Sequence, residues 1–171
     1  MSTSQPIRDT QDLTALREFY LKDEPNMRNY VLICLGVNSA LRISDLLELK
    51  WKDVYNFKDE NFKKHLIAYE KKTGKETLIA INENARNGLQ EYMKFLKKIS
   101  SEDYIFKGKY NGGHLSRSQA FRIIKHAAGE LNLENGISCH SMRKTFWLLC
   151  DGNAERRRQF LWIYTIIHHM R

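Results

Sequence analysis

HSMR, residues 140–143, is the stretch that decides how this chain is expected to fold. Its counterpart lies far upstream, where residues 40–46 read ALRISDL. Each stretch places an arginine beside a turn of apolar helix. We predict that folding brings Arg42, Arg143 and His140 around one phosphate, because a planar guanidinium group stays charged and offers paired donors to phosphate oxygens.

Such a group of residues suits the metal-free cleavage of a phosphodiester. Two guanidinium groups would stabilise the charge that builds on a pentacoordinate phosphorus. A lysine or histidine near the leaving oxygen can donate a proton, and a serine, tyrosine or histidine must act as the nucleophile. The two arginines, His140 and a lysine of a predicted hairpin supply every part except the nucleophile.

The composition favours a single globular domain with a polyanionic partner. The chain has 171 residues, of which 42% are hydrophobic and 28% are charged, and this length suffices for a full core. Lys and Arg number 28 against 20 Asp and Glu, which gives a net charge of +8. A positive surplus favours nucleic acid as a partner, although a merely soluble basic protein would show the same surplus.

Cysteine usage and apolar patterning bear on the compartment. The three cysteines, Cys34, Cys139 and Cys150, include no C-x-x-C pair. This argues for a reducing, cytoplasmic setting and against a disulfide framework or a cysteine zinc site. The N-terminus lacks the apolar core of a signal peptide, and no run approaches the roughly 18 apolar residues needed to span a membrane.

Hydrophobic periodicity predicts a mainly α fold with a small antiparallel β-hairpin sheet. Strands are expected at residues 64–70 and 76–81, joined by a glycine-containing turn. Helix 27–38 is apolar nearly all round and should be the central core helix, and Phe121 is expected to point inward. The other predicted helices span residues 11–22, 43–50, 83–98 and 118–131, with a last helix that begins near His140.

Three pieces of the sequence resemble the catalytic domain of the tyrosine recombinases, the phage-integrase family. They are the segment at residues 40–54, which ends in WKDV, the KTG of the hairpin at residues 72–74, and HSMRKTF at residues 140–146. The pieces occur in the family's order with family-like separations, and the resemblance covers roughly residues 8–147. Each piece alone is weak, but the three in order are specific.

The resemblance implies a role for each residue of the predicted phosphate site. Arg42 and Arg143 would activate the phosphate. His140, the histidine of the family's H-x-x-R motif, would act in proton transfer. Lys72 would be the hairpin lysine that protonates the leaving 5′ oxygen, and Asp45 would be a carboxylate that orients the arginine site.

The resemblance also implies a reaction. Members of the family break and rejoin DNA in site-specific recombination and integration. They form a 3′-phosphotyrosyl link and then pass the strand to a new 5′ hydroxyl, without a metal or a nucleotide cofactor. The expected partners are therefore double-stranded DNA and further copies of the protein, as a tetramer across two DNA sites. The expected source is a bacterium, a phage or a mobile element.

Each predicted role has a structural alternative. Arg42 could be an ordinary surface arginine at a helix start, and His140 could be a helix cap. Arg143 could form a structural salt bridge with Asp45 or Glu48. Lys72 could be a solvated charge at the hairpin tip. Four further basic residues could contact DNA phosphates or form a solvated face, namely Lys107, Lys109, Arg117 and Arg122.

The sequence departs from the family at both ends. Many members carry a separate N-terminal DNA-binding domain, whereas here residues 1–9 are expected to be a short polar N-terminal arm and the catalytic pattern follows directly. Residues 1–171 thus resemble the family's short form, a single catalytic-type domain. After Phe146 the pattern is lost, and residues 147–171 are expected to form an atypical tail.

This tail leaves the nucleophile open. In the family a further histidine or tryptophan, and then the catalytic tyrosine, follow the H-x-x-R motif. Here Tyr164 is the only tyrosine after Arg143 and comes too early, while His168 and His169 lie near the place of the second histidine. Tyr164 is either the nucleophile or an aromatic residue packed in a diverged, truncated or frameshifted tail. The alternative function is a catalytically inactive, truncated recombinase-derived protein that still binds DNA.

Overall fold

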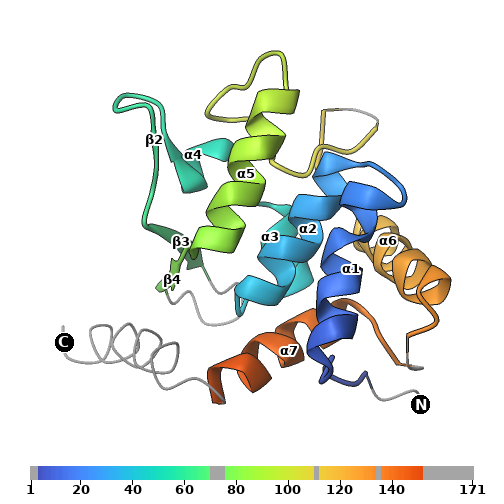
Figure 1. The fold of residues 1–171 in the computed structure, drawn as a ribbon. Helices are drawn as coiled ribbons and strands as arrows, with labels where there is room; N and C mark the ends of the chain where they lie inside the picture. The colour runs from blue at the N-terminus through green and yellow to red at the C-terminus, as the bar shows by residue number, and fades with distance from the viewer. Residues whose placement is uncertain (1–3, 70–75, 110–111, 134–135, 152–171) are drawn as a thin grey trace.

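The computed structural model describes residues 4–69, 76–109, 112–133 and 136–151, which form a mainly helical fold with small antiparallel sheets (Figure 1). In chain order the elements are α1 (Thr10–Lys22), α2 (Met27–Asn38), α3 (Ile43–Leu47), α4 (Trp51–Val54), β1 (Tyr55–Asn56), β2 (Asn61–Phe62), β3 (His65–Tyr69), β4 (Glu76–Ala80), α5 (Glu83–Phe95), α6 (Arg117–Glu130) and α7 (Cys139–Asp151). The predicted fold class is confirmed. None of the helices described is long and apolar enough to cross a membrane.

Short polar side chains begin the long helices. Asp9, Asn26 and Asn82 each accept a hydrogen bond from a backbone N–H in the first turn of α1, α2 and α5. Ser116 and Gln119 form a reciprocal pair at the start of α6, in which each side chain accepts from the other residue's backbone N–H. These bonds satisfy donors that a helix leaves without an internal partner, so the sequence itself fixes where the helices begin.

Helix α2 lies at the centre of the fold, as its apolar composition predicts. Residues 31–35 and Val37 are at most 2% exposed, and α2 packs against α1, α5 and α7. The approach of α7 is closest at Gly36, where an added Cβ would lie 2.5 Å from the Sδ atom of Met142. The absence of a side chain at Gly36 therefore lets α7 settle against the central helix.

The predicted hairpin is confirmed by β3 and β4. Their antiparallel register pairs His65 with Ala80 and Tyr69 with Glu76, and the connection at residues 70–75 lies outside the described residues. A second pair, β1 with β2, was not predicted. Strands of two residues are too short to show an alternating hydrophobic pattern, so nothing in the sequence indicated them.

The helix predicted at residues 43–50 is shorter than expected. It ends at Leu47, and a separate turn of helix, α4, begins at Trp51. The Asp53 carboxylate accepts a hydrogen bond from the backbone N–H of Lys50 at 2.7 Å, which caps the new helix. The break separates α3 from α4, and the first residue of α4, Trp51, has a buried side chain that is 1% exposed.

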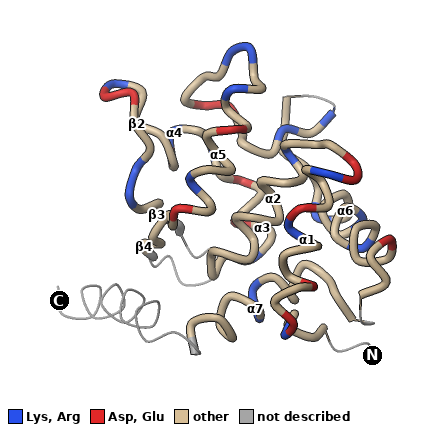
Figure 2. The backbone as a smooth tube through the Cα atoms, in the orientation of Figure 1, with Lys and Arg blue, Asp and Glu red and all other residues tan. Residues whose placement is uncertain are grey.

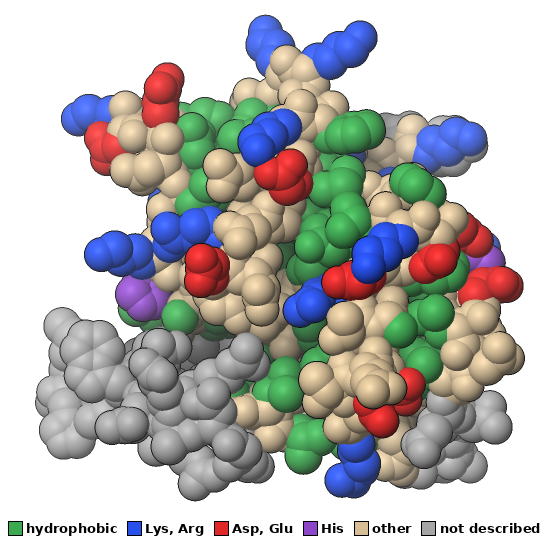
Figure 3. Space-filling view, viewed as in Figure 1, with side chains coloured by type: hydrophobic (Ala, Val, Ile, Leu, Met, Phe, Trp, Pro, Cys, Tyr) green, Lys and Arg blue, Asp and Glu red, His purple; other side chains and the backbone are tan. Residues whose placement is uncertain are grey.

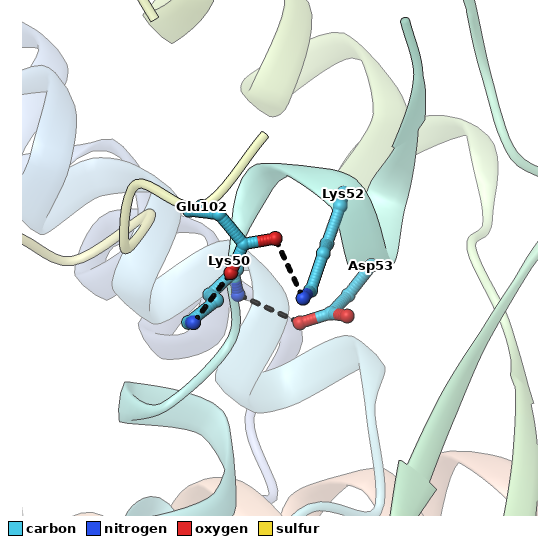
Figure 4. A network of polar contacts seen from close by, with 4 residues as sticks. All are labelled: Lys50, Lys52, Asp53 and Glu102. Carbon is cyan, nitrogen blue, oxygen red and sulfur yellow. Dashed lines mark hydrogen bonds and ion pairs between the residues drawn. The ribbon is translucent and has the colours of Figure 1, made fainter. Parts of the chain in front are cut away.

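A charged network joins α4 to the loop that follows α5 (Figure 4). The Glu102 carboxylate accepts hydrogen bonds from the ammonium groups of Lys50 at 2.8 Å and Lys52 at 2.7 Å. Backbone hydrogen bonds add to it, from Trp51 N–H to the Asp103 carbonyl and from Lys52 N–H to the Ser101 carbonyl. The network therefore fixes this loop against the start of α4.

The N-terminal arm is less polar in its packing than its sequence predicted. Ile7 is only 4% exposed and lies in the same apolar cluster as Met142 of α7. Figure 1 shows the arm running beside α7 at one end of the fold. Helix α7 itself continues through Trp147 to Asp151, past the point where the family pattern is lost. Residues 152–171 lie outside the described residues.

We predict that Gly36→Ala lowers the free energy of unfolding by up to about 2 kcal/mol, because moving the buried end of the Met142 side chain costs more than the roughly 0.5–1 kcal/mol that Ala gains over Gly within a helix. Urea denaturation measures the change. Gly129→Ala in α6 is the matched control, since an added Cβ there meets no atom within 4 Å. It should be neutral or stabilise by up to about 1 kcal/mol. Equal stability of Gly36→Ala and the wild type would contradict the tight packing of α7 on α2.

The charged network should make stability depend on pH. Hydrogen bonds from Lys50 and then Lys52 lower the pKa of Glu102 from 4.5 to about 2. A depressed carboxyl pKa stabilises the fold above the unfolded value, and this contribution is lost as the pH falls from 4.5 towards 2. Glu102→Gln should therefore be less stable than the wild type at pH 7, with the gap narrowing below pH 4.5.

Urea denaturation at pH 7, 4.5 and 3 measures this gap. Because Glu102 is exposed, solvent screens the network and the gap should be small. Glu91→Gln is the matched control, since its carboxylate contacts a single ammonium group, that of Lys94 at 2.7 Å. A gap between Glu102→Gln and wild type that stays constant with pH would show that the charge of Glu102 is not the cause.

Candidate functional site

The two predicted arginines and the histidine come from the starts of α3 and α7. Arg42 directly precedes α3 and is exposed. His140 is exposed and Arg143 is partly buried, one turn further along α7. Residues three apart lie on the same face of a helix. His140 and Arg143 therefore project from α7 together, as the H-x-x-R spacing predicts.

An open hollow brings these segments together. Its volume is about 750 Å³, and Ile43, the neighbour of Arg42, shares it with His140. Helix α6 forms another wall, so we call it the α3–α6–α7 hollow. Its lining residues are Ile43, Arg117, Ser118, Phe121, Arg122, Ser138, Cys139 and His140. The fold thus places Ile43, of the first arginine motif, in the same hollow as His140, of the second.

Helix α6 adds two basic residues to the hollow. The sequence alone did not decide whether they contact DNA or form a solvated face. Arg117 and Arg122 are both exposed and line the hollow beside His140. The same helix carries Lys125, and its one acidic residue, Glu130, stands at its last position. In Figure 2 the Lys and Arg positions of α6 are blue. None of the described residues that line the hollow is acidic, which favours an anionic ligand.

The sequence prediction that Phe121 is buried is wrong. It was expected to face inward, but it is 45% exposed and lines the hollow. The buried face of α6 is instead formed by small or branched residues, among them Ala120 and Ile124, both 0% exposed. The residue was missed because periodicity assigns every large apolar side chain to the core. An exposed aromatic ring between basic residues offers a flat surface to a ligand.

A different face of the protein carries no such one-sided charge. Figure 3 shows acidic and basic side chains interspersed with hydrophobic ones over α1, α2 and α5. The lining of the hollow differs from this face, because it includes Arg117 and Arg122 and no acidic residue among those described. The location of the basic residues, rather than their number, distinguishes the hollow.

Asp45 lies in the first turn of α3. Its backbone N–H donates to the Arg42 carbonyl at 3.0 Å, and its carboxylate accepts a hydrogen bond from the Ser44 hydroxyl at 3.2 Å. These bonds tie Asp45 to the residue beside the hollow. Its predicted role in orienting the arginines stays a prediction.

Two of the cysteines, Cys34 and Cys139, do not supply a ready nucleophile. Burial raises the pKa of the Cys34 thiol to about 11. Burial also raises the pKa of Cys139, which lines the hollow, although its own backbone and the nearby Arg117 charge partly oppose this. Both thiols are therefore protonated near neutral pH, and a protonated thiol is a poor nucleophile.

The remaining predicted residues lie outside the described part of the chain. Lys72 falls in the connection between β3 and β4, and Tyr164, His168 and His169 fall beyond Asp151. Their roles stay predictions. Within the described ranges, no three His, Cys, Asp or Glu residues gather in a way that could hold a metal ion.

Comparison with known proteins identifies the family. The model of the phage integrase family matches residues 9–149. The probable integrase/recombinase YoeC of Bacillus subtilis is 40% identical over 146 residues, which are 85% of this chain and 74% of that protein. Rickettsia bellii has a tyrosine recombinase, XerD, that is 31% identical over 88% of this chain and 53% of its own length.

A solved structure shares the fold. XerA recombinase matches with a TM-score of 0.69 at 18% identity, over 94% of this chain and 55% of that one. The present chain thus spans about half the length of XerA and of the Rickettsia XerD. The family match extends from just before α1 into α7 and includes both arginine motifs. The chain belongs to the phage integrase family, that of the tyrosine recombinases.

Proposed function

We propose that this chain breaks and rejoins DNA as part of a site-specific recombinase, through a 3′-phosphotyrosyl intermediate. The α3–α6–α7 hollow carries the proposal. It gathers His140, Arg117 and Arg122 with the neighbour of Arg42, and it has no acidic lining residue among those described. A cavity with this charge suits the phosphates of a polyanion.

The chemistry follows from the residue types. Arg42 and Arg143 each offer a planar fork of donors to nonbridging oxygens of one phosphate, and both stabilise the negative charge of the transition state. His140, exposed at the start of α7, moves a proton at the reacting oxygen. Lys72 of the hairpin protonates the leaving 5′ oxygen. No metal is required by this set of groups.

The partner is double-stranded DNA. Arg117 and Arg122 line the hollow with His140 and continue the positive surface onto α6, where neighbouring backbone phosphates would lie. Phosphate contacts position a protein on the duplex without reading its sequence. Relatives support this choice, since they are named as recombinases and integrases. Self-association on DNA, as a tetramer across two sites, is part of the same proposal.

A second candidate is a catalytically inactive protein that still binds DNA. It would apply if Tyr164, which lies outside the described residues, does not act as the nucleophile. Without a nucleophile the same arginines would hold the phosphate but cleave nothing. The two candidates share the DNA-binding surface and differ only in whether a covalent link forms.

We predict that the protein forms a denaturant-stable adduct with nicked suicide duplexes, in which the short cleaved fragment diffuses away and traps the covalent link. Because the target site is unknown, the duplexes carry a randomised segment that is sequenced after recovery. Arg42→Gln and Arg143→Gln should each slow adduct formation at least about 100-fold, as the loss of one charge-stabilising donor does. Arg86→Gln on α5 is the matched control and should leave the rate unchanged.

The outcomes separate the candidates. An adduct that is lost in Tyr164→Phe but kept in Tyr104→Phe assigns the nucleophile to Tyr164. An adduct that survives Tyr164→Phe assigns it to another residue. Binding that weakens steeply with salt, without any adduct, favours the inactive protein. The absence of both binding and adduct contradicts the DNA proposal.

A further inference from the structure

The N-terminal arm is bonded to the helix that carries His140 and Arg143. The backbone N–H of Ile7 donates to the Thr145 hydroxyl at 2.9 Å. The Lys144 ammonium donates to the Ser4 carbonyl at 2.6 Å, and the hydroxyls of Ser4 and Ser141 lie 3.1 Å apart. We call this set of bonds the arm–α7 contact. It joins segments that are more than 130 residues apart in the chain, as the separation of 138 between Ile7 and Thr145 shows.

The contact is buried where it meets α7. Ser141 and Thr145 are both 0% exposed, and Ile7 is 4% exposed. The Thr145 hydroxyl also donates to the Ser141 carbonyl at 2.8 Å, and the Ser141 hydroxyl accepts from the backbone N–H of Ser138 at 3.0 Å. The Ser141 hydroxyl also donates to the Gly136 carbonyl at 3.2 Å. Buried hydroxyls with two or more partners are held in one orientation, and the loss of a partner can leave a buried group unsatisfied.

The buried part of the contact, at Ser141 and Thr145, lies on the opposite side of α7 from the site. Residues advance by about 100° each around an α-helix. Ser141 and Thr145 therefore point about 150° away from the mean direction of His140 and Arg143. A rotation of α7 that broke the arm–α7 contact would turn His140 and Arg143 by the same angle.

We propose that Ser141 and Thr145 are positioning residues, through which the N-terminal arm holds α7 in the rotation that directs His140 and Arg143 at the DNA phosphate. Neither touches the substrate. The inference rests on the proposed function, because it concerns the same phosphate site. It adds that the segment ahead of α1 is a working part of that site. Movement of the arm would change phosphate binding without any change in the binding residues themselves.

Thr145→Val in the full chain tests the proposal. The substitution keeps the shape of the side chain but removes the acceptor for Ile7 and the donor to Ser141. Amide hydrogen exchange across residues 139–150 should increase, while exchange in α5 stays unchanged. Thr145→Ser keeps the hydroxyl and should restore protection. Thr14→Val in α1 is the matched control and should leave exchange in α7 unchanged.

A double-mutant cycle on DNA affinity then separates positioning from a general loss of stability. Thr145→Val should weaken binding to a duplex about three- to tenfold, the effect of one or two lost hydrogen bonds. In the Arg143→Gln background the same substitution should weaken binding less, because one of the two groups that it positions is already absent. Thr145→Ser should bind like the wild type.

Each outcome decides something. Equal losses from Thr145→Val with and without Arg143 would overturn the proposal, and so would wild-type affinity in Thr145→Val. Unchanged exchange in α7 would show that the arm does not hold the helix, and would overturn it also. A wild-type protein that binds no DNA would instead refute the proposed function, and the positioning role would fall with it.

Discussion

The packing of Met142 against Gly36 is the constraint on which the site depends. The central helix α2 has no side chain at Gly36, so the thioether of Met142 occupies that space. Met142 stands directly beside Arg143, and its burial therefore fixes the direction of its neighbour. Within HSMR the two inner residues are buried at 0% and 2% exposure, while His140 is exposed and Arg143 is partly buried. The motif thus contains both the buried residues that fix α7 and the two residues, His140 and Arg143, that are directed at the site.

The start of α3 is anchored in a comparable way. Leu46 and Leu47 are at most 1% exposed, and they belong to the core that also contains Trp51. Arg42 lies just ahead of these residues and remains exposed. The two arginines therefore come from segments far apart in the sequence, and the core between those segments helps to set their relation. A substitution in the core can therefore change the relative position of the two arginines without replacing any residue of the phosphate site.

The sequence predicted those parts of the structure that depend on local patterns. The apolar run of α2, the hairpin of β3 and β4 and the start of α7 each had a clear period or cap. Phe121 was wrongly predicted to be buried, because periodicity does not tell which of several apolar residues faces the core. The bonds of Ile7 and Ser4 to α7 were missed because they join distant segments through backbone groups, which leave no trace in the residue types. The sequence could not decide whether Arg117 and Arg122 contact DNA or form a solvated face, because only the fold places α6 beside His140.

The most direct test of this account is NMR of the arginine side chains. The protein is labelled with ¹⁵N, and the Nε–Hε signals are followed during titration with a nicked duplex. If Arg42 and Arg143 hold one phosphate, their two signals should shift with the same midpoint, and the Arg86 signal should not move. The account would be contradicted if one of the two signals stayed in place, or if the two moved with different midpoints.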